Sequence, residues 1–157
     1  MIQPHAFPAI QTYSRLLAES FARMTGKALL DGWRGDEAGF AETLFEAPFP
    51  LVSHGTQTDP IFCYANCAAL ALWEMTWDDF IQLPSRRSAE TVSDIQQERQ
   101  RLLAEAMQKG WVDNYSGVRI SATGKRFMIR DTVLWNVTDN HGTLHGQAAR
   151  IGHWKML

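Results

Sequence analysis

The segment of residues 59–84, DPIFCYANCAALALWEMTWDDFIQLP, constrains the fold more than any other part of this chain. A short apolar run, IFCY, follows Asp-Pro, as in a short buried strand. Asn66 then lies where a helix N-cap is expected, and Thr76 with Asp79 three residues later gives a second, weaker capping signal. The segment therefore predicts a strand, a capped short helix and a second short helix.

Several motifs of the chain resemble those of the MEKHLA family, which is PAS-like. They are EAPF at 46–49, SHG at 53–55, DPIF at 59–62, WEMTW at 73–77, LPSR at 83–86 and YSGVRI at 115–120. The resemblance covers residues 16–149, nearly the whole chain. It implies a stand-alone bacterial form of a domain that also occurs at the C-terminus of some plant homeodomain leucine-zipper regulators.

The expected fold class is α/β (α+β), a PAS-like domain with a five-stranded antiparallel sheet and short helices on one face. Helical periodicity predicts a helix over 10–24 that ends at Gly26, and a second over 93–109 that ends at Gly110. From residue 111 onward the period changes to two, which predicts three further strands. We expect an N-terminal helical extension at 1–47, a PAS-like core at 48–152 and a tail at 153–157.

The first predicted helix has an apolar stripe made by Ile10, Tyr13, Leu17, Phe21 and Met24. The resemblance implies that such a helix packs on the outer face of the sheet or across a homodimer interface. A helix that only covers its own domain is an equal alternative.

The charge pattern argues against partners that bind through electrostatics. The formal net charge is −2 and both signs are interspersed, so no basic surface for nucleic acid or for an anionic membrane is expected. No apolar run is long enough to span a bilayer, and the N-terminal sequence lacks the pattern of a signal peptide. These features predict a cytoplasmic protein.

The resemblance implies a ligand pocket between the sheet and the short helices. Its walls would come from residues 69–87 and from inward side chains of the last three strands. The candidate ligand-binding residues are Trp73, Arg86, Tyr115, Arg119, Asp131, Trp135 and Gln147.

Asp131 is the most informative of these candidates. It shares an alternation face with Phe127, Ile129, Val133 and Trp135, so a regular strand would bury it. A buried carboxylate needs a cationic partner such as an arginine. A β-bulge that turns Asp131 outward is the alternative.

Cofactor chemistry is only weakly indicated, and the cofactor is unknown. Light-sensing flavin PAS domains carry a reactive cysteine after the short helices, whereas residues 81–90 contain none. Cys63 and Cys67 fit small apolar side chains better than metal ligands. His54 and His145 are candidate haem ligands by position alone, and no hydrolase or phosphate-binding motif is present.

We therefore expect a non-enzymatic sensor module that binds a small ligand and signals through an unknown protein partner or a homodimer. The second hypothesis is a ligand-free interaction or dimerisation module, with a core filled by Trp73, Met75, Phe80, Met128 and Trp135. The third is a small-molecule enzyme, which would require Asp131, His145 and Arg119 to converge.

Overall fold

The computed structural model describes residues 3–157. Its helices are η1 (Pro4–Ala6), α1 (Pro8–Thr25), α2 (Glu37–Phe45), α3 (Cys67–Trp73), α4 (Trp77–Phe80), η2 (Ser85–Ser88) and α5 (Ser93–Lys109), where η marks a 3₁₀ helix. The strands are β1 (Leu51–His54), β2 (Phe62–Ala65), β3 (Trp111–Ile120), β4 (Arg126–Thr138), β5 (Leu144–Arg150) and β6 (His153–Met156). The α/β order and the local elements expected for residues 59–84 are confirmed.

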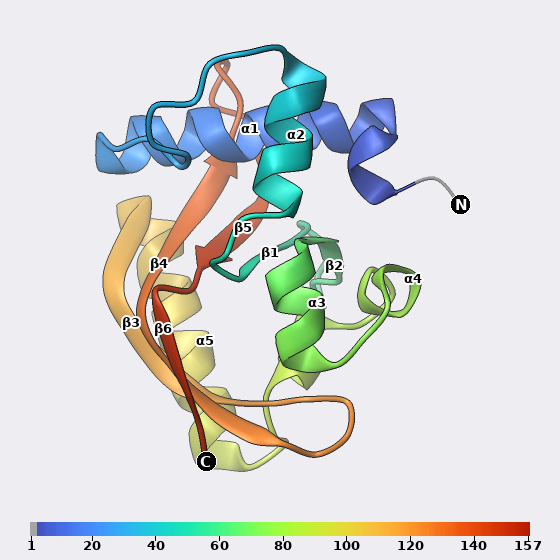
Figure 1. The fold of residues 1–157 in the computed structure, drawn as a ribbon. Helices are drawn as coiled ribbons and strands as arrows, with labels where there is room; N and C mark the ends of the chain where they lie inside the picture. Colours follow the sequence, from blue (N-terminus) through green and yellow to red (C-terminus); the bar gives the residue numbers. More distant parts are fainter. Residues whose placement is uncertain (1–2) are drawn as a thin grey trace.

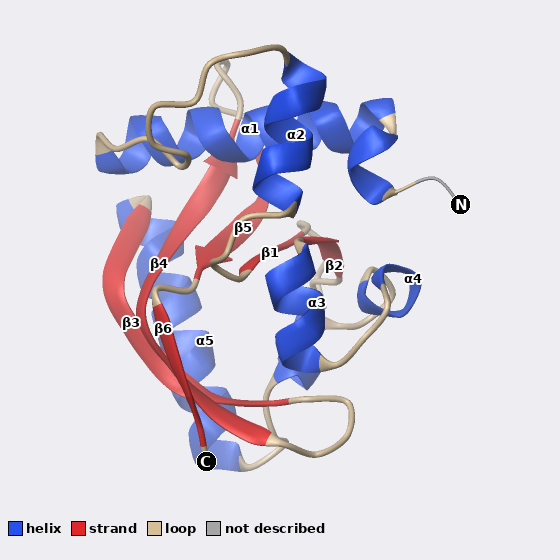
Figure 2. Cartoon of the chain, viewed as in Figure 1, coloured by secondary structure: helices blue, strands red, loops and turns tan. Residues whose placement is uncertain are grey.

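One antiparallel sheet organises the chain, with strand order β2-β1-β5-β4-β3 (Figure 1). This is the predicted PAS-like sheet, in which β1 and β2 form a hairpin and β3, β4 and β5 form a meander. Figure 2 shows α1 and α2 gathered at one end of the view, with α3, α4 and α5 further down around the sheet.

The sheet contains a sixth strand that the sequence analysis did not predict. The residues expected as a tail, 153–157, instead contain β6, which pairs with residues 127–130 of β4. The reason lies in the length of β4. Its C-terminal part pairs with β5, so the N-terminal part has a free edge on the same side that the end of the chain can fill. The sequence HWKM at 153–156 does alternate polar and apolar side chains, but four residues are the shortest length at which such a pattern indicates a strand.

The two faces of the sheet carry separate apolar clusters. The inner cluster lies between the sheet and the helices α3, α4 and α5, and includes Phe62, Trp73, Phe80, Phe127 and Leu134. The outer cluster lies between the sheet and the helices α1 and α2, and includes Leu17, Phe21, Leu44, Tyr64 and Trp135. Each face is thus buried, which explains why the strands hold few long runs of polar residues.

Asn66 joins the hairpin to the first short helix. Its side chain is fully buried, and its Oδ1 accepts hydrogen bonds from the backbone N–H groups of Ala69 at 3.1 Å and Leu51 at 2.9 Å. Its Nδ2 donates to the carbonyl oxygens of Phe49 and Leu44 at 2.8 and 3.3 Å. The predicted N-cap therefore also fixes the start of β1 and the end of α2.

At Asp131, the side chains of β4 reverse their alternation between the inner and the outer face of the sheet. Phe127 and Ile129 belong to the inner cluster, whereas Trp135 and Val137 belong to the outer one. Asp131 has a φ of +49°, and the register with β3 shifts at this point by one extra residue on β4. An inserted residue reverses the inward and outward alternation of all that follow. The bulge alternative is confirmed, and the expectation of a regular strand is wrong.

Helix α1 packs on the outer face of its own sheet. Leu17 and Phe21 are buried there, and the Tyr13 hydroxyl forms a hydrogen bond with Ser53 Oγ of β1 at 2.8 Å. The side of α1 that faces solvent includes the polar residues Arg15 and Glu19. The apolar stripe predicted from the sequence is thus used within the chain.

No helix in residues 3–157 combines the length and the apolar character needed to cross a bilayer.

Candidate functional site

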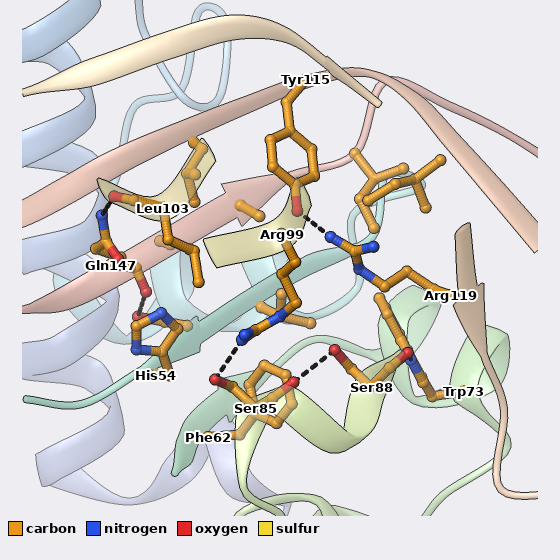
Figure 3. A pocket seen from close by; sticks show the side chains of 17 residues that line it. His54, Phe62, Trp73, Ser85, Ser88, Arg99, Leu103, Tyr115, Arg119 and Gln147 are labelled. Carbon is orange, nitrogen blue, oxygen red and sulfur yellow. Dashed lines mark hydrogen bonds between the residues drawn. The ribbon is translucent and has the colours of Figure 1, made fainter. Parts of the chain in front are cut away.

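A cavity of about 50 Å³ lies between the inner face of the sheet and the helices. Its apolar walls include Val52, Phe62, Trp73, Ile129 and Leu134. Its polar side chains include His54, Ser85, Arg99, Tyr115, Arg119 and Gln147 (Figure 3). The volume suits a few water molecules or a very small ligand, and it is well below the roughly 300–1,000 Å³ of pockets for drug-sized ligands. A larger ligand would require lining side chains to move.

Arg99 enters the cavity from α5. Only 8% of the residue is exposed, and its Nη2 donates a hydrogen bond to Ser85 Oγ at 2.6 Å. Ser85 is itself fixed, because its backbone N–H donates to the carbonyl of Pro60 at 2.7 Å and its carbonyl accepts from Ser88 Oγ at 2.7 Å. The η2 turn therefore presents a neutral acceptor to the Arg99 guanidinium.

Arg119 enters the same cavity from β3 and is 5% exposed. Its Nη2 donates to the Tyr115 hydroxyl, and its Nη1 donates to the carbonyl of Val118 at 2.7 Å. Tyr115 and Arg119 lie four residues apart on one strand, so both point to the inner face. Gly117 lies between them, and a Cβ at this position would come within 2.8 Å of Arg119 Nη1. The glycine leaves the space in which the guanidinium rests.

The electrostatics of Arg99 and Arg119 are unusual. Buried charges are normally paired with an opposite charge. Within residues 3–157, no aspartate or glutamate forms an ion pair with Arg99 or Arg119. Burial, and then the positive charge of Arg119, lowers the pKa of Arg99 to about 10, so it still carries its charge near neutral pH. The negative charge of Asp59, which pairs with Arg86, opposes this shift but is among its smaller causes. The cavity therefore holds two buried cations that only neutral groups contact.

His54, at the end of β1, adds an acceptor to the cavity. Its Nδ1 lies 3.0 Å from the carbonyl oxygen of Gly55, so we place the proton on Nδ1. Nε2 then exposes a lone pair, and this buried atom has no hydrogen-bond partner among the described residues. Burial lowers the pKa of His54; the hydrogen bond to Gly55 opposes this shift, and the charge of Arg99 adds to it. The imidazole is therefore neutral near pH 7.

A groove of about 310 Å³, here called the outer groove, lies outside the cavity, between α5 and β3. Its walls include Asp94, Glu98, Leu102 and Met128. The groove and the cavity share three lining residues, which are Arg99, Tyr115 and Arg119. These side chains form the partition between the buried cavity and the outer groove.

The structure brings together four of the seven residues proposed from the sequence. Trp73, Tyr115, Arg119 and Gln147 line the cavity, and their role in binding stays a prediction. The Gln147 side chain is held at 3.0 Å from the carbonyl of Leu103, which ties β5 to α5.

The other three proposed residues do not line the cavity. Arg86 is exposed and pairs with Asp59 at 3.2 Å. Asp131 faces solvent because of the bulge in β4. Trp135 lies on the outer face of the sheet, where its Nε1 donates to Ser20 Oγ of α1 at 3.0 Å. The bulge accounts for both Asp131 and Trp135, because it reverses their faces.

Sequence reasoning missed Arg99, considered His54 only as a haem ligand, and included Ser85 only within the expected pocket wall of residues 69–87. A signal for Arg99 was present, since it lies on the apolar stripe of α5 with Leu102 and Ala106. A charge within an apolar stripe indicates a buried ionic site when the helix packs on a core. The contact between Ser85 and Arg99 was not predicted, because it joins elements that are separate in sequence.

The residues of the enzyme hypothesis do not converge. Arg119 is buried, whereas Asp131 and His145 are exposed, and His145 Nε2 lies 3.0 Å from Asp139 Oδ2 in the β4–β5 connection. Across the described part of the chain, no three His, Cys, Asp or Glu side chains are grouped as metal ligands.

Comparisons with known proteins identify the family and the fold. The family model of the MEKHLA domain matches residues 11–156. No curated protein matches the sequence.

Solved structures share the fold at low sequence identity. The PAS domain of a protein from Colwellia psychrerythraea is 12% identical, with a TM-score of 0.60 over 71% of this chain and 90% of that one. A light-oxygen-voltage domain studied with a flavin analogue is also 12% identical, with a TM-score of 0.59 over 76% of this chain and 84% of that one. An RNA-binding light-oxygen-voltage receptor is 16% identical, with a TM-score of 0.65 over 80% of this chain and 36% of that one. At such identities these similarities concern the fold alone.

Proposed function

The chain belongs to the MEKHLA domain family, and from this premise we propose that it is a sensor module which binds a small ligand in the cavity between the sheet and α5. Its structural neighbours are PAS and light-oxygen-voltage domains, which supports a sensory role. We propose binding without catalysis, because the cavity has donors and an acceptor but lacks a set of converging acids and bases in the described residues.

One observation carries this proposal. Polar groups in a protein interior are normally satisfied by hydrogen bonds. In this cavity His54 Nε2 is a buried acceptor without a protein partner, and two guanidiniums face the same space. A core that served only for stability would gain by replacing these groups with apolar ones. The guanidinium donors that no protein group uses favour a ligand that accepts hydrogen bonds from them.

A ligand-free interaction module is the alternative, and the size of the cavity favours it. Trp73, Phe80 and Phe127 pack at aromatic distances, with ring centroids 6.0 Å apart for Trp73–Phe80 and 5.1 Å apart for Trp73–Phe127. These rings fill much of the space that a large cofactor would need. In this alternative, a protein partner would contact the exposed apolar side chains of Trp154 and Met156 on β6.

We propose that the protein, either as a monomer or as a homodimer, transmits the signal of ligand binding to a protein partner in the cytoplasm. The mixed surface charge, with a net charge of −2, favours a protein partner over nucleic acid or a membrane. Because the apolar stripe of α1 packs on the sheet, a dimer through α1 would use its polar face.

Native mass spectrometry and an absorbance scan of freshly purified protein test ligand binding directly. The wild-type protein should retain a small mass, or should be stabilised by a size-filtered metabolite extract in a thermal unfolding assay. Ala149→Leu adds side-chain volume inside the cavity and should abolish both effects. Ala104→Leu, at an exposed position of α5, is the matched control and should leave them unchanged.

The interaction-module alternative gives the opposite result. The wild-type protein would then have the mass of the polypeptide alone. The metabolite extract would change the unfolding temperatures of wild type and Ala149→Leu equally. That outcome would refute the sensor proposal.

A further inference from the structure

The two buried arginines reach one cavity from different elements. Arg99 belongs to α5 and Arg119 to β3, and each residue is more than nine-tenths buried. The groups that contact them are neutral, namely the hydroxyls of Ser85 and Tyr115 and the carbonyl of Val118. Two like charges in a site of low polarity destabilise each other unless an anion compensates them.

The donor capacity of the pair is only partly used. A guanidinium has five N–H donors in a planar fork. The hydrogen bonds within residues 3–157 use one nitrogen of Arg99 and two of Arg119. A planar oxyanion between the two side chains would accept from the remaining donors, because the spacing of its oxygens matches the guanidinium fork. This geometry requires no contribution from another chain.

The other residues that line the cavity restrict the size and the further chemical groups of the anionic ligand. Phe62, Ile129 and Leu134 form apolar walls, which suit a short hydrocarbon body. His54 Nε2 presents a lone pair, so a second anionic group on that side would meet repulsion instead of a donor. The volume of about 50 Å³ excludes a large molecule unless side chains move.

We infer that the cavity binds a short monocarboxylate, with the carboxylate between Arg99 and Arg119 and the hydrocarbon part against the apolar walls. This inference rests on the proposed function and specifies its ligand. The binding is non-covalent, and the charge of the ligand offsets that of the buried arginines.

The outer groove provides the entry route. A ligand that passes between α5 and β3 meets Arg99, Tyr115 and Arg119, which separate the groove from the cavity. The carboxylate then competes for the Arg119 donor that the Tyr115 hydroxyl accepts. Occupancy would therefore release Tyr115 and link α5 to β3 through the ligand, which gives a physical route from binding to a change in the position of α5.

Titration followed by amide NMR of the full chain tests the inference, with propionate and butyrate as probes at constant ionic strength. Both should shift amide signals of α5 and β3 saturably. Propionamide, which has the same shape but no charge, should bind at least about 10-fold more weakly, as expected for the loss of charge-assisted hydrogen bonds. Succinate and inorganic phosphate should also bind more weakly than propionate.

Two substitutions locate the site. Arg99→Met and Arg119→Met should each weaken propionate binding by about 10- to 100-fold. Arg101→Met is the matched control, because Arg101 lies on the same helix with 61% of its side chain exposed, and it should bind as wild type does. Since neither buried arginine has a carboxylate partner in the described residues, both methionine variants should unfold at or above the wild-type temperature.

Each contrary result has a distinct meaning. Equal binding of propionamide and propionate, preferential binding of phosphate or succinate, or unchanged affinity in both methionine variants would overturn the carboxylate assignment. The sensor proposal would survive these results if the protein retains a neutral or differently charged ligand. If wild-type protein binds neither a monocarboxylate nor any retained species, both proposals fail. Should the methionine variants not fold, the wild-type comparison of propionate with propionamide still decides the inference.

Discussion

Gly146 of β5 lies so close to His54 of β1 that a Cβ at residue 146 would be 1.9 Å from the His54 carbonyl oxygen. Gly146 also has a φ of +154°, which side chains disfavour. This close approach positions the end of β1, and with it the imidazole that lines the cavity. Gly146→Ala should therefore destabilise the protein by about 2–4 kcal/mol, measured by urea unfolding.

The matched control for this change is Gly142→Ala. Gly142 has a φ of +81°, but a Cβ at residue 142 would have no neighbouring atom within 4 Å, so only the backbone strain of about 1 kcal/mol is expected. Equal losses in the two variants would show that the contact with His54 has no structural importance.

Asn66 is the second position at which one side chain organises several elements. Asn66→Ala would leave two backbone N–H groups and two carbonyl groups without their present partner. We expect a loss of at least about 3 kcal/mol, since each buried group without a partner costs about 1–3 kcal/mol. Thr76→Ala, which removes a single exposed cap to Asp79, should cost about 1 kcal/mol. A smaller loss for Asn66→Ala than for Thr76→Ala in urea unfolding would contradict this view.

Local signals predicted most of the fold. The caps at Asn66 and Thr76 and the C-terminal Gly26 act through hydrogen bonds within a few residues, so each is visible in the sequence. Helical periodicity similarly located the bounds of α5. The resemblance to a known family supplied the order of the elements, which local signals alone leave open.

Contacts between distant segments explain what the sequence did not reveal. One inserted residue at Asp131 reversed the inward and outward alternation of the side chains that follow it in β4. No residue type in the sequence predicts such a bulge. The candidate site consequently lost Asp131 and Trp135. It gained Arg99 and Ser85, whose contact depends on how η2 packs against α5. Periodicity assigns a residue to a face, but the identity of its neighbours follows only from tertiary packing.

The hydrogen bond from Trp135 to Ser20 gives a test of how α1 is attached to the sheet. Both residues are fully buried, and the Ser20 hydroxyl accepts from the indole while it donates to the carbonyl of Leu16 at 2.8 Å. Ser20→Ala should cost about 1–2 kcal/mol, because the indole N–H would lose its partner. Ser14→Ala, where the hydroxyl donates to the Ile10 carbonyl within the same helix, should cost less.

A double-mutant cycle separates this interaction from packing. Trp135→Phe removes the donor, so the two changes Ser20→Ala and Trp135→Phe should show a coupling of about 0.5–1.5 kcal/mol. Additive effects of these two substitutions in urea unfolding would mean that the hydrogen bond makes no net contribution.

The neutral His54 predicts how stability depends on pH. Burial lowers the pKa of folded His54 below the 6.5 of an unfolded histidine. As the pH falls below about 6.5, the unfolded chain binds a proton that the folded chain does not, so stability decreases until the folded pKa is reached. The contribution is at most about 1.4 kcal/mol per pH unit. The hydrogen bond to the Gly55 carbonyl opposes this lowering of the pKa, whereas the positive charge of Arg99 acts in the same direction because it disfavours the imidazolium.

Urea unfolding at about pH 7.5 and about pH 5.5 measures this effect. Wild-type protein should lose more stability between the two conditions than His54→Gln, which cannot titrate. His153→Gln, at an exposed position, should behave as wild type does. If wild type and His54→Gln show the same pH dependence, the imidazole is not held neutral by its surroundings. Nε2 would then be protonated at low pH, and under those conditions the restriction to ligands with a single anionic group would not hold.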